Sequence, residues 1–278
     1  MDVKYITDEV FNFLDRTALP RILDMFGSEA FAGEKQRLRT QEPNPHQWIE
    51  RQAALQKEQN AQVADLTRSL LSASLPGILP EASLWFKGDG RPANELLWVV
   101  SPFEFALMAP ATVSIALQQA DDLLMGILCT VTETEVSITT GEKDDGSWTE
   151  DRKLTVNQHT LSSASANMQF MLTGNKLPEN CSGRLLSLRK QYAISTMTNN
   201  RSENISHYMN SVANGSIDFC LGFNFSYHDI AAAICIVEQA GGIVTDFSGG
   251  RKKLYSGESF FCSNKAIHRQ FMDLLSSS

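Results

Sequence analysis

Residues 227–233 (YHDIAAA) and residues 236–246 (IVEQAGGIVTD) together decide the fold of this chain. The acidic Asp229 lies where a helix would begin, and a carboxylate there is stabilised by the positive end of the helix dipole. The alanines that follow would let this helix pack tightly, and Gly241-Gly242 would end it. The apolar run at residues 243–245 is typical of a buried strand. The segment therefore predicts a buried helix that leads into a core strand.

The chain before this segment predicts two long helices followed by a meander of short strands. Residues 7–26 carry apolar side chains at helical spacing, with Gly27 as the stop, and residues 48–71 carry a second such pattern. Residues 56–60 are polar on every side, so we expect the second helix to be interrupted there. Short apolar runs predict strands at residues 84–86, 96–100, 113–117, 123–131 and 135–140, with a loop at 141–146.

The rest of the chain alternates strands and helices, without internal repeats or a long linker. Strands are predicted at residues 153–156, 216–220, 243–245 and 259–262, and helices at 185–192, 208–213, 228–239 and 266–275. We expect two halves that pack as one unit. Residues 1–150 would form an α+β half, and residues 151–278 an α/β half that carries the His228-Asp229 helix.

Composition limits the partners and the compartment. The 278 residues are 42% hydrophobic and carry a formal net charge of −8, which disfavours nucleic acid and anionic lipid as main partners. No apolar run approaches the roughly 18 residues of a membrane span, and the start of the chain lacks the features of a signal peptide. The five cysteines form no Cys-x-x-Cys pair. We therefore expect neither a disulfide framework nor a zinc site, and a cytoplasmic location.

The opening segment resembles the W-D-x-A-A-G…E-A-G-G-x-V-x-D signature of the inositol monophosphatase family. Residues 214–218 (NGSID) resemble the family's G-x-x-D segment, and residues 113–117 (VSIAL) its A-V-S-I-A-L strand. Residues 126–128 (GIL) and 152–156 (RKLTV) are similar to its G-V-V and N-G-x-x-L-x-V segments. The resemblance implies a layered αβαβα fold, with a mostly antiparallel first sheet and a mixed second sheet. It also implies a homodimer.

The same resemblance implies a phosphatase that uses two or three Mg²⁺ ions, held by carboxylates of a G-E-E turn, a D-P-[IL]-D-G-T turn and the W-D aspartate. This chain departs from that pattern. The first turn reads Gly88-Asp89-Gly90, so a glycine replaces the second glutamate. The second reads SPFEFA at residues 101–106, so Ser101 replaces the bridging aspartate and Phe105-Ala106 replaces Gly-Thr. Three further departures are Asn60 for an upstream aspartate, residues 203–205 for the G-[ST]-A turn, and Gly222 for a substrate-binding glutamate.

Three acidic residues, Asp89, Glu104 and Asp229, remain near the expected centre. They could hold at most a single, weak Mg²⁺ ion; alternatively, Asp229 caps its helix and the other two are solvated turn residues. His228 replaces the family's tryptophan and is either a new chemical group or a polar filler. We expect a protein that has lost the family's phosphatase activity, needs no cofactor and binds a small, phosphorylated ligand.

Two other functions stay open. The first is a working Mg²⁺-dependent phosphatase of inositol, sugar or nucleotide monophosphates, with a relaxed site of Asp89, Glu104 and Asp229. The second is a metal-free enzyme of altered chemistry in a biosynthetic pathway, in which His228 and Glu104 act as an acid–base pair.

Overall fold

The first sheet of the computed structural model has six strands in the order β1-β2-β3-β4-β5-β6. The strands are β1 (Ser83–Phe86), β2 (Leu96–Glu104), β3 (Ala111–Gln119), β4 (Asp122–Val131), β5 (Val136–Asp144) and β6 (Ser147–Trp148). β1 and β2 are parallel, and each later pair of neighbours is antiparallel. The structure describes residues 1–27, 45–104, 111–131, 136–144, 147–148, 154–160, 169–171, 196–197 and 205–276.

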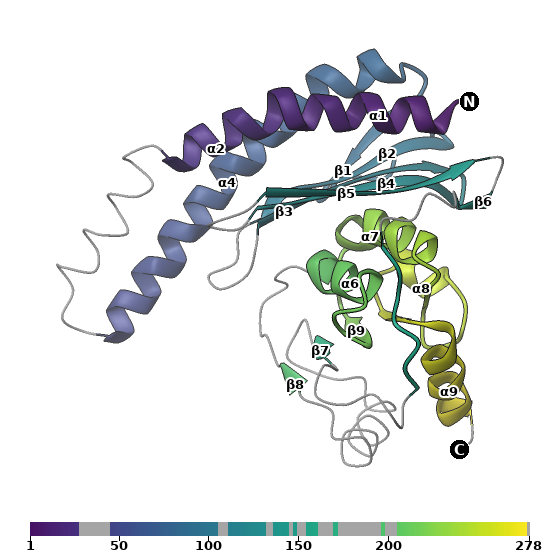
Figure 1. Ribbon diagram of the computed structural model, residues 1–278. Helices are drawn as coiled ribbons and strands as arrows, with labels where there is room; N and C mark the ends of the chain where they lie inside the picture. The colour runs from purple at the N-terminus through teal and green to yellow at the C-terminus, as the bar shows by residue number, and fades with distance from the viewer. Residues whose placement is uncertain are drawn as a thin grey trace.

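Long helices cover one face of this sheet (Figure 1). They are α1 (Val3–Phe13), the π-helical segment η1 (Leu14–Ala18), α2 (Leu19–Gly27) and α4 (Pro45–Ile78). The carboxylate of Asp2 caps α1 by accepting a hydrogen bond from the backbone N–H of Tyr5 at 2.9 Å. Apolar side chains at helical spacing, such as Val10 and Leu14, pack with Trp98 of β2 in one core. The spacing that predicts these helices therefore also determines which face they bury.

Two helices, α6 (Ile205–Ala213) and α7 (Tyr227–Gln239), lie between the first sheet and a second one (Figure 1). The second sheet has the order β10-β11-β9-β7-β8. Its strands are β7 (Gln169–Met171), β8 (Thr196–Met197), β9 (Phe219–Phe223), β10 (Ile243–Thr245) and β11 (Ser259–Ser263). β11 is antiparallel to β10 and β9, whereas β7 is parallel to β9 and β8. The second sheet is therefore mixed.

The last layer is formed by α9 (Lys265–Ser276), which follows the short helix α8 (Lys252–Tyr255) and β11. Phe260 of β11 joins the core around α7, whereas the neighbouring Phe261 stacks on Phe271 of α9 with ring centroids 3.8 Å apart. The two faces of the second sheet are thus covered by different helices. The order of layers confirms the αβαβα fold. Within the described ranges, no helix is both long and apolar enough to span a bilayer.

α7 is enclosed between the sheets, and every residue of it except Glu238 is buried. Two glycines let the first sheet approach its backbone. A Cβ atom at Gly126 of β4 would lie 2.5 Å from the carbonyl oxygen of Ala232, and one at Gly141 of β5 would lie 2.7 Å from the carbonyl carbon of Cys235. This close approach determines how near the first turn of α7 lies to the first sheet.

Some predicted boundaries are wrong. α4 continues through residues 56–60, because glutamine, lysine and glutamate are good helix formers even where they are polar on every side. The loop predicted at 141–146 is instead partly strand, since β5 extends to Asp144 and β6 follows. Residues 154–156 are irregular rather than a strand, and β9 begins three residues later than predicted. The helix predicted at 185–192 lies outside the described residues.

We expect Gly126→Ala to lower the free energy of unfolding by about 1–3 kcal/mol, because the new methyl group would meet helix backbone that cannot move aside. Gly90→Ala is the matched control, since a Cβ atom there has nothing within 4 Å. It should change stability by less than about 0.5 kcal/mol. Urea denaturation measures both, and a Gly126→Ala variant as stable as the parent would show that α7 does not approach the sheet this closely.

Candidate functional site

Asp229 lies in the first turn of α7 and is only 8% exposed. Its backbone N–H donates to the carbonyl of Ser226 at 3.0 Å, and the hydroxyl of Ser206 donates to its backbone carbonyl. The helix dipole favours a carboxylate at this end, but burial penalises a charge that has no partner. The negative charge of this buried carboxylate therefore requires further hydrogen-bonding or positively charged partners.

Lys87 and Ser101 are these partners. The Nζ atom of Lys87 lies 3.0 Å from Oδ1 of Asp229, and the Oγ atom of Ser101 donates to the same oxygen at 2.7 Å. The pairing of β1 with β2 positions both residues, because Phe86 is in register with Val100 and the N–H of Lys87 donates to the Val100 carbonyl at 2.9 Å. The Lys87 and Asp229 side chains are 24% and 11% exposed, so the ion pair is largely shielded from water.

Asp89 lies in the exposed turn after β1 and pairs with a different cation. Arg68 of α4 donates from Nη2 to Oδ2 of Asp89 at 2.8 Å, and its guanidinium lies 4.4 Å from the centroid of the Phe86 ring. The indole Nε1 of Trp85 donates to the Asp89 carbonyl at 3.2 Å and holds the turn. Because both charged side chains are more than one third exposed, water screens this pair.

His228 is buried beside Asp229 and is held by two neighbours. Its Nδ1 atom is 3.1 Å from the hydroxyl of Ser226, and its ring meets that of Trp85 edge-on, with centroids 4.3 Å apart. Burial lowers the pKa of His228 to about 4. The charge of Asp229 acts in the opposite direction and raises this pKa, that of Lys87 lowers it further, and that of Asp89 raises it. The ring is therefore neutral at pH 7. Its Nε2 atom is buried with no hydrogen-bond partner among the described atoms, so it can still donate or accept a hydrogen bond.

The two described carboxylates of the site, those of Asp229 and Asp89, already have internal partners. The described residues contain no group of three or more histidine, cysteine, aspartate or glutamate side chains arranged to hold a metal. Oδ1 of Asp229 already faces an ammonium group and a hydroxyl donor, and Asp89 faces a guanidinium. A bridging metal ion would have to displace these internal partners.

The structure brings only part of the predicted site together. Asp229 and His228 are adjacent at the start of α7. Asp89 is linked to them through Trp85, whose indole donates to the Asp89 carbonyl and whose ring packs on that of His228. Glu104 ends β2, but its side chain lies outside the described part of the chain, as do residues 105–106. The acid–base pairing of Glu104 with His228 therefore stays a prediction.

Sequence reasoning gave no role to Lys87, Arg68 or Ser206. The position of Lys87 was a signal, because a lysine directly before the Gly88-Asp89-Gly90 turn would repel a metal ion bound by that turn. No comparable signal marked Ser206, since its bond to the Asp229 carbonyl depends on how α6 packs against α7.

The shifted pKa of His228 predicts how stability changes with pH. The ordinary pKa of 6.5 falls to about 4 in the folded state, so the unfolded state binds the proton more tightly between these values. The free energy of unfolding should therefore fall as pH drops through this window, by up to about 3 kcal/mol from this group. His228→Phe should remove that part of the pH dependence, which urea denaturation at several pH values measures.

Ser226→Ala is the matched control, because it removes a hydrogen bond to the ring and leaves the ring buried. It should keep the pH dependence. If His228→Phe retains the parent's full dependence, His228 is not buried as a neutral ring.

Comparison with known proteins agrees with this architecture. Residues 92–278 match the model of the inositol monophosphatase family. A fructose-1,6-bisphosphatase/inositol-1-monophosphatase of Thermotoga maritima is 39% identical over 64 residues, which span 23% of this chain and 25% of that protein. A putative Nus factor SuhB of Neisseria meningitidis serogroup B is 27% identical over 193 residues, which span 67% of this chain and 71% of that protein.

Solved structures share the fold at lower sequence identity. The inositol monophosphatase of Anabaena (Nostoc) sp. PCC 7120 matches with a TM-score of 0.58 at 18% identity, over 94% of this chain and 97% of that one. An IMPase/NADP phosphatase complexed with Mg²⁺ and phosphate matches with a TM-score of 0.61 at 15% identity, over 78% of this chain and 82% of that one. Since the family model matches well over half of the residues of this chain, the chain belongs to the inositol monophosphatase family.

Proposed function

We propose that this chain has lost the metal-dependent phosphomonoesterase activity of its family and uses the former metal cleft to bind a small, phosphorylated molecule without a divalent ion. The proposal rests on the ion pair between Lys87 and Asp229, with the hydroxyl of Ser101 on the same oxygen. The protein would act either as a binding protein or through a repurposed activity in this cleft.

Replacing a metal ion by an ammonium group removes the chemistry that a phosphatase needs. Mg²⁺ carries two charges and takes oxygen ligands at about 2.1 Å in octahedral geometry. It can therefore neutralise a phosphoryl group and activate a water molecule at the same time. The ammonium of Lys87 carries one charge and donates hydrogen bonds, so it balances Asp229 but does not generate a nucleophile. Ser101 further reduces the negative charge that would attract metal.

Positive side chains around the turn after β1 suit a phosphate group. Arg68 and Lys87 pair with Asp89 and Asp229 at this turn. Arg91 follows the turn, and its guanidinium lies 5.5 Å from the centroid of the Trp85 ring and donates to the Ala120 carbonyl at 3.2 Å. A related phosphatase was solved with Mg²⁺ and phosphate. In this chain we propose that guanidinium groups attract the phosphate directly, because each has five N–H donors and can donate two parallel hydrogen bonds to it.

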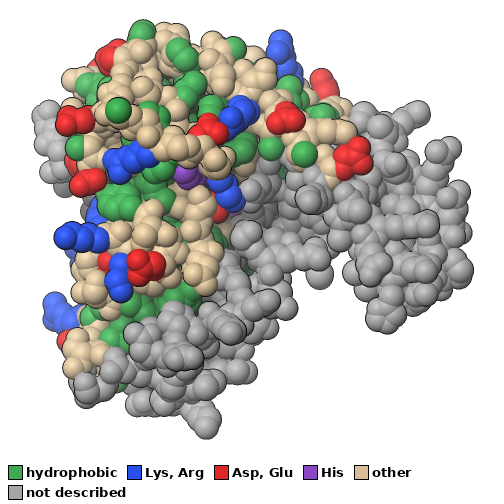
Figure 2. All heavy atoms as spheres, turned by 180° about the vertical axis from the view of Figure 1, so that it is seen from behind, with side chains coloured by type: hydrophobic (Ala, Val, Ile, Leu, Met, Phe, Trp, Pro, Cys, Tyr) green, Lys and Arg blue, Asp and Glu red, His purple; other side chains and the backbone are tan. Residues whose placement is uncertain are grey.

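We also propose a cytoplasmic homodimer that acts on small molecules. The described cysteines, Cys129, Cys220, Cys235 and Cys262, are buried and free, and burial raises the pKa of Cys129 to about 12. Such unreactive thiols suit a reducing compartment. Acidic and basic side chains are interspersed over the described part of the face in Figure 2, which does not favour nucleic acid or anionic membrane. The dimer is what the family resemblance implies.

Titration calorimetry tests the loss of metal dependence. We expect Mg²⁺ alone to give no binding heat at millimolar concentration, and inorganic phosphate or inositol monophosphate to bind in the presence of EDTA. A panel of inositol, sugar and nucleotide monophosphates should release no phosphate when Mg²⁺ is added. Tight Mg²⁺ binding together with turnover that Asp229→Asn abolishes would establish a working phosphatase instead.

Lys87→Met should convert the site into one that responds to metal. The substitution leaves the shielded Asp229 carboxylate without its cation and should lower the free energy of unfolding by about 1–3 kcal/mol. Added Mg²⁺ should recover part of this loss, because the ion can now approach Asp229, while the parent protein should not respond. Thermal unfolding with and without Mg²⁺ measures both effects.

Lys4→Met is the matched control for this experiment. Lys4 is 68% exposed and its Nζ is 3.7 Å from Glu142, so losing that pair should cost less than about 1 kcal/mol and give no Mg²⁺ response. An equal Mg²⁺ response in all three proteins would contradict the assignment of Lys87.

A further inference from the structure

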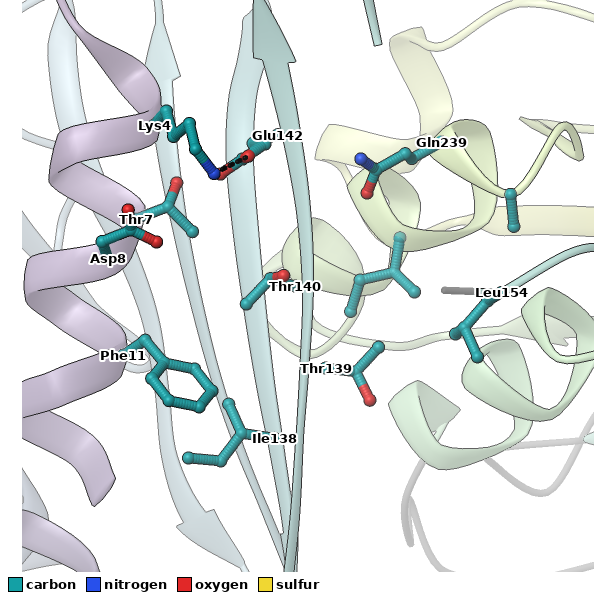
Figure 3. Close-up of a pocket in the computed structure, with 12 residues that line it drawn as sticks. Lys4, Thr7, Asp8, Phe11, Ile138, Thr139, Thr140, Glu142, Leu154 and Gln239 are labelled. Carbon is teal, nitrogen blue, oxygen red and sulfur yellow. Dashed lines mark ion pairs between the residues drawn. The ribbon is translucent and has the colours of Figure 1, made fainter. Parts of the chain in front are cut away.

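A pocket of about 340 Å³ between α1, β5 and the last turn of α7 is unsuited to an anion (Figure 3). Among its described lining residues, the ionisable ones are Asp8, Glu142 and Lys4, so carboxylates outnumber cations. A phosphate group would therefore be repelled there. Guanidinium and ammonium groups meet instead at the turn after β1, where Arg68 and Lys87 each pair with a carboxylate.

Arg68 is the more loosely held of these two cations. Its guanidinium lies 4.4 Å from the centroid of the Phe86 ring, which positions it at the turn. Of its five N–H donors, the described residues accept one hydrogen bond, from Nη2 to Oδ2 of Asp89 at 2.8 Å. The Arg68 and Asp89 side chains are 39% and 45% exposed, so water screens their pair far more than that of Lys87 and Asp229. A guest from solvent can therefore exchange with Asp89 most easily.

The turn that carries Asp89 has open space beside it and does not depend on the Asp89 side chain. A Cβ atom added at Gly88 or Gly90 would meet no described atom within 4 Å. The backbone N–H of Asp89 donates to the Phe86 carbonyl at 3.0 Å, and its carbonyl accepts from the Trp85 indole. The carboxylate can therefore turn toward solvent while the backbone of the turn stays in place.

We propose, on the basis of the function proposed above, that Arg68 is the anion-binding residue of the cleft and that Asp89 occupies it until a dianionic phosphate monoester takes its place. A tethered carboxylate competes at high effective concentration. A guest carboxylate or phosphodiester has one charge, so it offers Arg68 little more than Asp89 already does. A phosphate monoester carries close to two negative charges and three acceptor oxygens, and it can take two parallel hydrogen bonds from the guanidinium. The exchange thus selects a dianion.

A ³¹P NMR titration of the intact chain in EDTA tests this exchange with methyl phosphate and dimethyl phosphate. At about pH 8 the first is a dianion and the second a monoanion. We expect methyl phosphate to bind at least about tenfold more tightly. Arg68→Gln should weaken methyl phosphate binding by at least about tenfold. Asp89→Asn should tighten it by about twofold to fivefold, because the guest no longer has to displace a carboxylate from an exposed ion pair.

A double-variant cycle separates exchange from simple charge repulsion. In the Arg68→Gln background, Asp89→Asn should change the affinity by less than about twofold, because no guanidinium remains to be freed. Asp65→Asn is the matched control, since Asp65 is an exposed acid three residues before Arg68 on α4 and its loss leaves the Arg68–Asp89 pair intact. It should bind methyl phosphate as the parent does, and thermal unfolding should confirm that all variants fold.

The outcomes distinguish this assignment from the function on which it rests. Equal tightening by Asp89→Asn with and without Arg68 would indicate general repulsion and overturn the exchange. Equal affinity for the two methyl esters would overturn the selection of a dianion. Methyl phosphate binding that Arg68→Gln leaves unchanged would refute the role of Arg68 and leave the phosphate cleft standing. Absence of binding in both the parent and Asp89→Asn would refute the cleft and the exchange together.

Discussion

The buried carboxylate of Asp229 must be balanced by positive charge, and this requirement governs the candidate site. α7 can hold the carboxylate at this depth because Gly126 and Gly141 let its backbone approach the first sheet. The turn after β1 then brings Lys87 to Oδ1, and β2 brings Ser101 to the same atom. One helix and two strands therefore meet at a single charged oxygen. The family fold is kept, and we propose that Lys87 and Ser101 take the place of metal as the partners of Asp229.

The same charge balance links the site to the protein's proposed function. A carboxylate that already has an ammonium and a hydroxyl partner gains little from a divalent ion, whose binding would require both to move. The neutral ring of His228 lies beside this pair with one nitrogen unpartnered among the described atoms. We therefore propose that the cleft binds an anion through hydrogen-bonding groups and positive side chains.

The helices and antiparallel strands were predictable because their patterns are local. Apolar spacing marks α1 and α9, and the acidic residue, alanines and paired glycines mark α7. β7 and β8 had no such signal, because strands of three and two residues depend on pairing with β9. β9 itself begins late because the side chain of Asn214 accepts a hydrogen bond from the N–H of Ser216 at 2.9 Å and holds a turn.

The positions of the candidate site were predictable, but their partners were not. The family resemblance implies that Ser101 stands where relatives have a bridging aspartate, yet it does not imply that the Ser101 hydroxyl donates to Asp229, 128 positions away. The Lys87 pair likewise depends on the register of β1 with β2 and on the depth of α7. Comparison with the family motifs therefore shows where carboxylates differ, whereas the partners of Asp229 follow only from how β1, β2 and α7 pack together.

A crystal grown with Mn²⁺ and phosphate, measured for anomalous scattering, tests the central claim most directly. We predict no manganese peak within about 2.5 Å of Asp229 Oδ1, and the Nζ atom of Lys87 within hydrogen-bonding distance of that oxygen. Two ordered manganese ions ligated by Asp229, Glu104 and further carboxylates, with Lys87 turned away, would contradict it.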